Sequence, residues 1–210
     1  AELISILNEM SINGYSGIAV FPIDDTQVKN KINQLVDEGI VVMTFNSRID
    51  GIHDLCFLGQ DHVQGGVAAG GLMGHLLPDG GEVGVIISST SLSCHQCRLK
   101  GFQEKLASRY PDLHIVDIKE NQDRKDEAFK YTLEYCNRYP NLKGIYITGG
   151  GIGGVGTALD IAGKAGKIKV ICHDLVPDTL TLLQNGTVDF AIGQSATNQG
   201  YQIVKILFDY

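Results

Sequence analysis

The amino-acid sequence predicts an α/β protein made of two lobes, each a parallel sheet flanked by helices. Short apolar segments rich in Val and Ile alternate with amphipathic segments of helical period along the whole chain. The run Ile40–Asn46 is apolar almost throughout, which is typical of a parallel strand buried on both faces. The pattern predicts about eight strands, which is large for one sheet, and two sheets would each have an ordinary size.

The elements of the first part follow from apolar spacing and from turn residues. Residues 1–10 carry Leu3, Ile6, Leu7 and Met10 on one helical face, and we interpret the chain as a fragment that begins within a longer protein. The expected order after this helix is a strand over 17–22, a helix capped near Asp25 and ended at Gly39, strands over 40–46 and 55–61, and a helix over 62–76.

The second part continues the alternation. We expect a strand over 82–88, a helix that ends before Pro111, a strand over 113–118, a helix over 123–138, strands over 144–148 and 167–174 with a helix between them, a short helix over 177–185, a strand over 188–193 and a final helix through Leu207. Gly66, Gly70 and Gly74 form a small-residue stripe, which predicts close packing of that helix.

The predicted lobes are not continuous in sequence. Residues 1–61 plus 194–210 form an incomplete N-terminal lobe, and residues 62–193 form a C-terminal lobe. The chain passes between them near Gly59–Asp61 and again near Gly193 and Gln194. A ligand cleft is expected between the lobes, because ligands of such sheets bind beyond the carboxyl ends of the strands.

Composition excludes several classes of function. The 210 residues are 43% hydrophobic and 20% charged, and no apolar run approaches the roughly 18 residues of a membrane span. A net charge of −7 argues against nucleic-acid binding by this stretch itself. Five cysteines, an odd number, favour a reducing, cytoplasmic location.

Polar side chains gather directly after the predicted strands, where they face the expected cleft. Carboxylates, amides and a guanidinium in one place satisfy the hydroxyl donors and acceptors of a polyol. The set comprises Asp24, Asp25, Asn46, Ser47, Asp61, the loop 88–95 with His95, Arg98, the glycines 149–151, His173, Asp174 and Gln194.

The stretch 144–174 admits two interpretations. Gly149, Gly151 and Gly154 spell GxGxxG between a strand and a helix, and Asp174 ends the next strand, which is the dinucleotide-binding pattern. The alternative is a cleft wall whose glycines let the backbone approach a small polar ligand. The pattern ordinarily belongs to the first strand of a sheet, whereas several strand–helix units precede it here, so we favour the cleft wall.

Enzyme and metal chemistry have weak support. Cys94-His-Gln-Cys97 is compatible with a redox pair or half of a zinc site, but the chain has no second CxxC. There is no GxSxG and no nucleophile–base pairing that spacing supports. We therefore expect no enzyme, no catalytic residue, no metal and no cofactor.

A family resemblance rests on six segments in order. They are Gly17–Asp24, Ile40–Ser47, Phe57–Asp61 with Ala68-Ala-Gly, His95–Phe102, Lys169–Asp174 and Ala191–Gln194. Together they resemble the type I periplasmic-binding-protein fold, and more closely the effector-binding domain of LacI/GalR-family transcription regulators. The resemblance covers essentially all of the chain.

The resemblance implies two Rossmann-like lobes and a sugar or sugar-like effector. It implies that Arg98 holds ligand hydroxyls bidentately, that Asp174 accepts from ring hydroxyls, that Asn46 binds from the opposite lobe, and that Gln194 lies at a hinge crossing. His95 faces the same loop as Arg98, and Asp61 completes the expected set. The Asn that the family usually has after strand 144–148 is replaced by Gly149–Gly151, so we expect backbone groups near Gly150 to substitute for it.

The resulting hypothesis is an effector-binding domain of a LacI-type regulator. A carbohydrate effector would change the angle between the lobes, and a homodimer would transmit the change to operator DNA through an N-terminal domain that is not in this chain. No membrane partner is expected. The alternative is an extracytoplasmic sugar-binding protein of an ABC transporter, which shares the fold and the cleft chemistry, and an NAD-dependent enzyme is a more remote one.

Overall fold

The structure is a computed structural model that describes residues 2–210 and divides them into two compact units. The first unit comprises Ala1–Gln60, Ser91–Cys94 and Ser195–Tyr210, and the second comprises Asp61–Thr90 and His95–Gln194. The short segment Ser91–Cys94, which the sequence prediction places in the C-terminal lobe, is grouped with the first unit. The predicted start of the opening helix at Ala1 lies outside the described residues.

The first unit is a parallel three-stranded sheet with helices on both faces. Its elements are α1 (Glu2–Ile12), β1 (Gly17–Val20), α2 (Thr26–Asp37), β2 (Val41–Phe45), β3 (Cys56–Leu58) and α8 (Ala196–Asp209), and the strand order is β1-β2-β3. Ile18 and Val20 point toward α1 and α2, whereas Gly17 lies against Leu207 of α8. Asp25 caps α2 by accepting from the backbone of Gln27 at 2.7 Å, which fixes where that helix begins.

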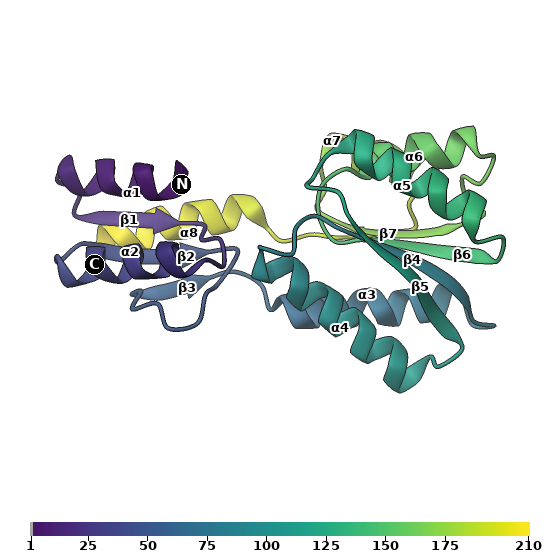
Figure 1. The fold of residues 1–210 in the computed structure, drawn as a ribbon, viewed down its shortest axis with the longest axis horizontal. Coiled ribbons are helices and arrows are strands. Elements are labelled where there is room, and N and C mark those ends of the chain that lie inside the picture. Colours follow the sequence, from purple (N-terminus) through teal and green to yellow (C-terminus); the bar gives the residue numbers. More distant parts are fainter. Residues whose placement is uncertain (1) are drawn as a thin grey trace. The chain divides into compact units, whose positions relative to one another are not determined.

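The second unit is a parallel five-stranded sheet, ordered β5-β4-β6-β7-β8 (Figure 1). Its elements are α3 (His62–Leu76), β4 (Gly81–Ile87), α4 (Ser93–Arg109), β5 (Leu113–Glu120), α5 (Lys125–Arg138), β6 (Leu142–Ile147), α6 (Ile152–Ile161), β7 (Lys169–His173), α7 (Pro177–Gln184) and β8 (Phe190–Ile192). The first two residues of α4 are grouped with the first unit. The α/β class and the two parallel sheets predicted from the sequence are confirmed.

Alternation along the central strands builds two hydrophobic cores in the second unit. On β6, Ile145 and Ile147 join the core beneath α5, α6 and α7, while Tyr146 between them joins the core beneath α3 and α4. These helix groups lie on opposite sides of the sheet in Figure 1. Because successive side chains of a strand point to opposite faces, a continuous apolar run is required wherever both faces are covered.

Helices α3 and α4 approach closely enough for their backbones to touch. A Cβ atom added to Gly66 would lie 2.0 Å from the carbonyl oxygen of Arg98, and one added to Gly101 would lie 2.0 Å from that of Val63. The expected close packing of the glycine stripe is therefore confirmed. This packing fixes the position of Arg98 relative to α3. Within residues 2–210, no helix is both long and apolar enough to cross a membrane.

Candidate functional site

The site is built where three neighbouring strands of the second unit end. β4, β6 and β7 lie side by side, and the residues that follow them are Ser88, Thr148 and Asp174. The Thr148 amide donates to the Ile86 carbonyl at 2.9 Å, so the pairing of β4 and β6 continues to the strand end. The carboxyl ends of parallel strands share one edge of the sheet, and ligands of such sheets bind there.

Arg98 brings a guanidinium to this edge from the second turn of α4. Its side chain is 2% exposed, and Nη1 donates to the Thr148 carbonyl at 2.6 Å. Nε and Nη2 are also buried, and neither has a hydrogen-bond partner within residues 2–210. No carboxylate in this part of the chain forms an ion pair with Arg98. Two buried donor nitrogens of a cation therefore lack an acceptor, an arrangement that costs free energy unless a ligand supplies oxygen.

His95 lies beside Arg98 and is 7% exposed. Its Nδ1 lies 3.1 Å from the Thr148 hydroxyl. Burial, followed by the nearby positive charge of Arg98, lowers the pKa of His95 to about 4. The imidazole is therefore neutral at pH 7, and it can both donate and accept a hydrogen bond.

His173, the last residue of β7, is a second buried histidine at this edge of the sheet. Its Nε2 lies 2.8 Å from the hydroxyl of Tyr146, whose ring stacks on Phe102 with a centroid distance of 4.4 Å. Burial, with Arg98 next in effect, lowers the pKa of His173 to about 2. Two neutral histidines thus lie beside the buried guanidinium, and neither adds a positive charge to it.

These two histidines make the stability of the fold depend on pH. In the unfolded chain both protonate near pH 6.5, whereas in the folded protein His95 does so only near pH 4 and His173 lower still. Between about pH 6.5 and 4 the unfolded state binds more protons, so stability is full above this window and falls as pH decreases through it. Each histidine contributes a slope of up to about 1.4 kcal/mol per pH unit.

We expect the urea midpoint to fall between pH 7 and pH 5, and His95→Gln to reduce the slope of that fall because Gln does not titrate. The control is His114→Gln, the same substitution at an exposed position of β5, which should leave the urea midpoint at pH 7 unchanged. Parallel profiles for the wild-type protein and the His95 variant would contradict the assignment.

Asp174 and Gln194 meet at the same edge of the sheet. The Gln194 Nε2 amide lies 2.8 and 2.7 Å from the two carboxylate oxygens of Asp174, and it donates to that carboxylate. The backbone of Asp174 has a φ of 68°, in the left-handed region that Asp tolerates better than most residues. The carboxylate keeps lone pairs that can accept from ligand hydroxyls.

The glycine loop after β6 is bound by two side chains that follow β5. The Gly150 amide donates to Asp123 Oδ1 at 2.6 Å, and its carbonyl accepts from Asn121 Nδ2 at 2.9 Å. β5 continues two residues beyond its predicted end at Ile118, which brings Asn121 and Asp123 to the strand ends. That backbone groups near Gly150 replace a missing Asn toward the ligand stays a prediction.

Asn121 and Asp123 are additional polar residues at this edge. Asn121 is fully buried, and its Oδ1 has no hydrogen-bond partner in the described part of the chain. The sequence signal for both residues is the alternation in Val116–Glu120, which extends the strand. With the strand end at Glu120, Asn121 and Asp123 would have been included among the polar residues that follow strands.

The same contacts explain the GxGxxG spacing without a dinucleotide. A Cβ on Gly149 would lie 2.6 Å from His95 Cε1, and one on Gly154 would lie 2.0 Å from the Lys125 carbonyl oxygen of α5. Gly149 thus makes room for the histidine, and Gly154 permits close helix packing. In a dinucleotide site the loop amides bind the pyrophosphate, but here the Gly150 amide already binds the Asp123 carboxylate. The negative charge of that carboxylate would also repel a pyrophosphate.

Two further predicted residues, Asn46 and Asp61, make contacts within their own units. Asn46 belongs to the first unit, where it follows β2 with a φ of 59°, and its backbone N–H donates to the Leu58 carbonyl at 3.1 Å. Asp61 accepts from the Gln64 amide at 3.0 Å and caps α3, so its Oδ1 has a structural role. The contribution of each to ligand binding stays a prediction.

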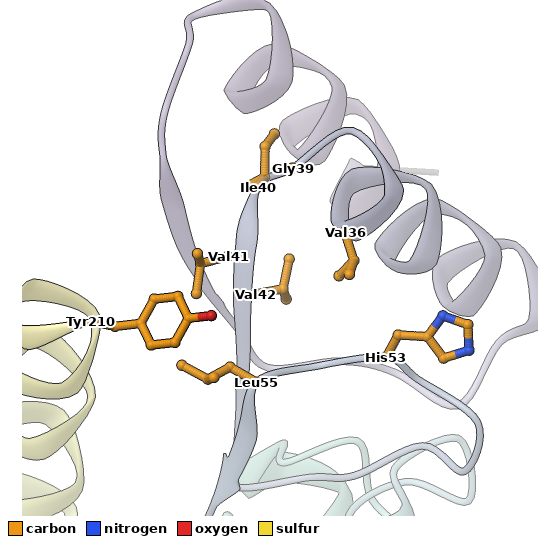
Figure 2. A pocket seen from close by; sticks show the side chains of 8 residues that line it. All are labelled: Val36, Gly39, Ile40, Val41, Val42, His53, Leu55 and Tyr210. Atoms are coloured by element: carbon orange, nitrogen blue, oxygen red, sulfur yellow. The ribbon is translucent and has the colours of Figure 1, made fainter.

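A hollow in the first unit has different chemistry. Its volume is about 230 Å³, and it is lined by Val36, Gly39, Ile40, Val41, Val42, His53, Leu55 and Tyr210. Figure 2 shows the Tyr210 ring beside Val41 and Leu55, with aliphatic side chains around it. Such a lining offers few hydrogen-bonding groups to a polyol, so we do not assign the ligand here.

Comparison with known families decides the classification. The model described as "Periplasmic binding protein domain" matches residues 1–210. The chain belongs to the periplasmic-binding-protein domain family. The resemblance to the type I periplasmic-binding-protein fold is therefore confirmed, whereas the finer assignment to LacI/GalR regulators gains no support from the relatives described next.

The relatives of this periplasmic-binding-protein domain are sugar-binding proteins. A D-ribose/D-allose-binding protein of Pseudomonas aeruginosa is 24% identical over 206 residues, covering 93% of this chain, which spans 63% of the relative's length. The solved sugar-binding protein of a sugar ABC transporter from Bacillus halodurans is 32% identical with a TM-score of 0.89. An arabinose-binding protein, AraP from Geobacillus stearothermophilus, is 32% identical with a TM-score of 0.82. Each alignment covers 98% of this chain and 70% of the solved chain.

These relatives also bear on the expectation that the protein is not an enzyme. They are binding proteins rather than enzymes, in line with the expected absence of catalysis. Among residues 2–210, no group of three or more His, Cys, Asp or Glu side chains is placed to hold a metal ion. The Cys94-His-Gln-Cys97 motif is accordingly not part of such a cluster.

Proposed function

We propose that this domain binds a monosaccharide and belongs to a sugar-binding protein of the transporter type. The observation that carries the proposal is the buried guanidinium of Arg98, whose Nε and Nη2 have no acceptor in the described chain. A sugar hydroxyl supplies an acceptor oxygen, and adjacent hydroxyls satisfy the two donors together.

The same edge of the sheet also supplies acceptors. A hydroxyl group donates one hydrogen bond and accepts others, so a site that holds several hydroxyls needs both kinds of partner. The Asp174 carboxylate accepts, and the neutral His95 imidazole does either. This mixture suits an uncharged polyol better than a phosphate or a hydrocarbon.

The regulator hypothesis is the less supported of the two sugar-binding functions. The motifs that suggest it belong to a fold that both classes share, and the relatives described above are sugar-binding proteins. Operator DNA, a homodimer and a cytoplasmic location stay predictions tied to that hypothesis. A basic helix-turn-helix encoded ahead of this domain in the full-length gene would support the regulator hypothesis. A signal or lipoprotein segment at that place would contradict it.

A ligand panel tests the proposed function. Purified protein is heated with D-ribose, D-allose, D-xylose, L-arabinose or NADH, and unfolding is followed by fluorescence. We expect at least one sugar to raise the unfolding temperature and NADH to leave it unchanged, because a ligand that binds the folded state stabilises it by mass action. Stabilisation by NADH alone would refute the sugar assignment.

Replacement of Asp174 tests the acceptor side of the site. Asp174→Asn retains a residue that tolerates the left-handed backbone but removes the charge, so folding should be preserved. We expect the affinity for the stabilising sugar, measured by calorimetry, to fall about 10- to 100-fold, the value of one or two charge-assisted hydrogen bonds. Asp160→Asn, at an exposed position of α6, is the control and should bind as the wild type does.

A further inference from the structure

Two thiols occupy the first turns of α4. Cys94 is the second residue of the helix and is buried, and Cys97 lies three residues later and is half-buried. All five cysteines of the chain are thiols in the structure. Burial raises the pKa of Cys172 to about 12 and also raises that of Cys136, so these two thiols are poor nucleophiles at neutral pH.

Helix geometry places the Cys94 and Cys97 backbones at a distance that a disulfide can bridge. Residues three apart in an α-helix have Cα atoms about 5 Å apart, as follows from the rise and radius of the helix. Disulfides span about 4.4–6.8 Å between Cα atoms. Side chains at this spacing also lie on one face, and the positive end of the helix dipole at a first helical turn favours negative charge.

We propose that Cys94 and Cys97 form a redox modification site that closes reversibly into an intrahelical disulfide. The co-reactant is a low-molecular-weight disulfide. The Cys97 thiolate, the more accessible one, attacks a sulfur of that disulfide, and one small thiolate leaves. The Cys94 thiolate then attacks the Cys97 sulfur and displaces the second small thiolate. Two protein thiols are oxidised, one small disulfide is reduced to two thiols, and the two protons end on them.

The modification falls within the proposed sugar site. His95 lies between the two cysteines in sequence, and Arg98 follows Cys97 directly. A disulfide constrains the Cβ positions of the two cysteines, and we infer that this constraint disturbs the turn that carries His95 to its contact with Thr148. The oxidised protein therefore binds sugar less tightly. This consequence, unlike the disulfide itself, rests on the proposed function.

Counting thiols tests the disulfide without any sugar. Protein treated with oxidised glutathione is denatured in acid, alkylated and weighed by mass spectrometry. We expect three alkylated cysteines instead of five, with a mass loss of two hydrogens, and all five again after dithiothreitol. Five alkylated cysteines after oxidation, at redox potentials that oxidise a helical CxxC peptide of this sequence, would overturn the proposal.

Single variants assign the roles of the two thiols. Cys94→Ala should trap Cys97 as a mixed disulfide with glutathione, and Cys97→Ser should remain unmodified because Cys94 is buried. Cys56→Ala, which removes a half-buried thiol from β3, is the matched control and should still form the disulfide. Disulfide formation that requires Cys56 and survives Cys97→Ser would refute the assigned pair.

Calorimetry with the stabilising sugar tests the coupling. We expect at least tenfold weaker binding by the oxidised protein, recovery after reduction, and no redox effect in the Cys94→Ala/Cys97→Ser double variant. Equal affinity of both redox forms would overturn the coupling. If no sugar binds either form, the proposed function fails, whereas the alkylation count still decides on the disulfide.

Discussion

Arg98→Met is expected to abolish sugar binding while leaving the ligand-free fold intact. Methionine approximates the length of the arginine side chain and removes its buried charge. The loss of the Nη1 bond to Thr148 is offset because Nε and Nη2 no longer remain buried without acceptors. We expect the unfolding temperature without ligand to change by no more than about 2–4 °C, the equivalent of roughly 1 kcal/mol in a protein of this size.

Affinity for the stabilising sugar should fall at least about 100-fold, since hydrogen bonds from a charged donor contribute about 1.5–3 kcal/mol each. Calorimetric titration measures this loss. The matched control is Lys100→Met, which removes a cation from an exposed position of the same helix and should bind normally. If Arg98→Met retained wild-type affinity, the guanidinium would not be a ligand contact and the proposed site would be wrong.

Gly66→Ala is expected to destabilise the second unit strongly. The added Cβ would lie 2.0 Å from the Arg98 carbonyl oxygen and 2.8 Å from the Phe102 nitrogen, and both are backbone atoms that cannot rotate away. Helices α3 and α4 must separate, which should cost about 3 kcal/mol or more in urea denaturation. Since Arg98 moves with α4, sugar binding should weaken as well.

Gly71→Ala on the same helix is the matched control. The nearest atom to its added Cβ is Lys105 Cε at 3.5 Å, an ordinary contact. We expect no loss of stability and a gain of up to about 1 kcal/mol from helix propensity. Equal effects of the two substitutions would show that propensity, rather than the backbone contact of the helices, governs the first result.

The sequence was sufficient to predict those elements whose hydrophobic periodicity and capping residues indicate the same boundaries. The helix expected over 62–76 is α3 to the residue, because Asp61 supplies a cap and Pro78 follows its end. β5 was predicted too short, since Lys119 and Glu120 are charged and suggest a loop, although they lie on an edge strand where charge is tolerated. That error removed Asn121 and Asp123 from the predicted site.

Other features of the site depend on contacts between distant segments. Arg98, His95 and Asp174 follow from the position of polar residues near strand ends, which is a local pattern. The engagement of Gly150 by Asp123 joins loops that lie 27 residues apart, and the Gly154 contact with Lys125 joins two helices. Sequence spacing alone cannot distinguish a glycine that cradles a phosphate from one that lets two backbones touch.

The position of Tyr146 has a consequence for how the binding residues are held. Its ring is part of the core beneath α3 and α4, and its hydroxyl contacts His173 at the strand end. Tyr146 and His173 both belong to strands, so His173 and, through the Thr148 carbonyl, Arg98 are held in place by the sheet. The second unit is thus preorganised, and little side-chain entropy on this side is lost when a ligand arrives.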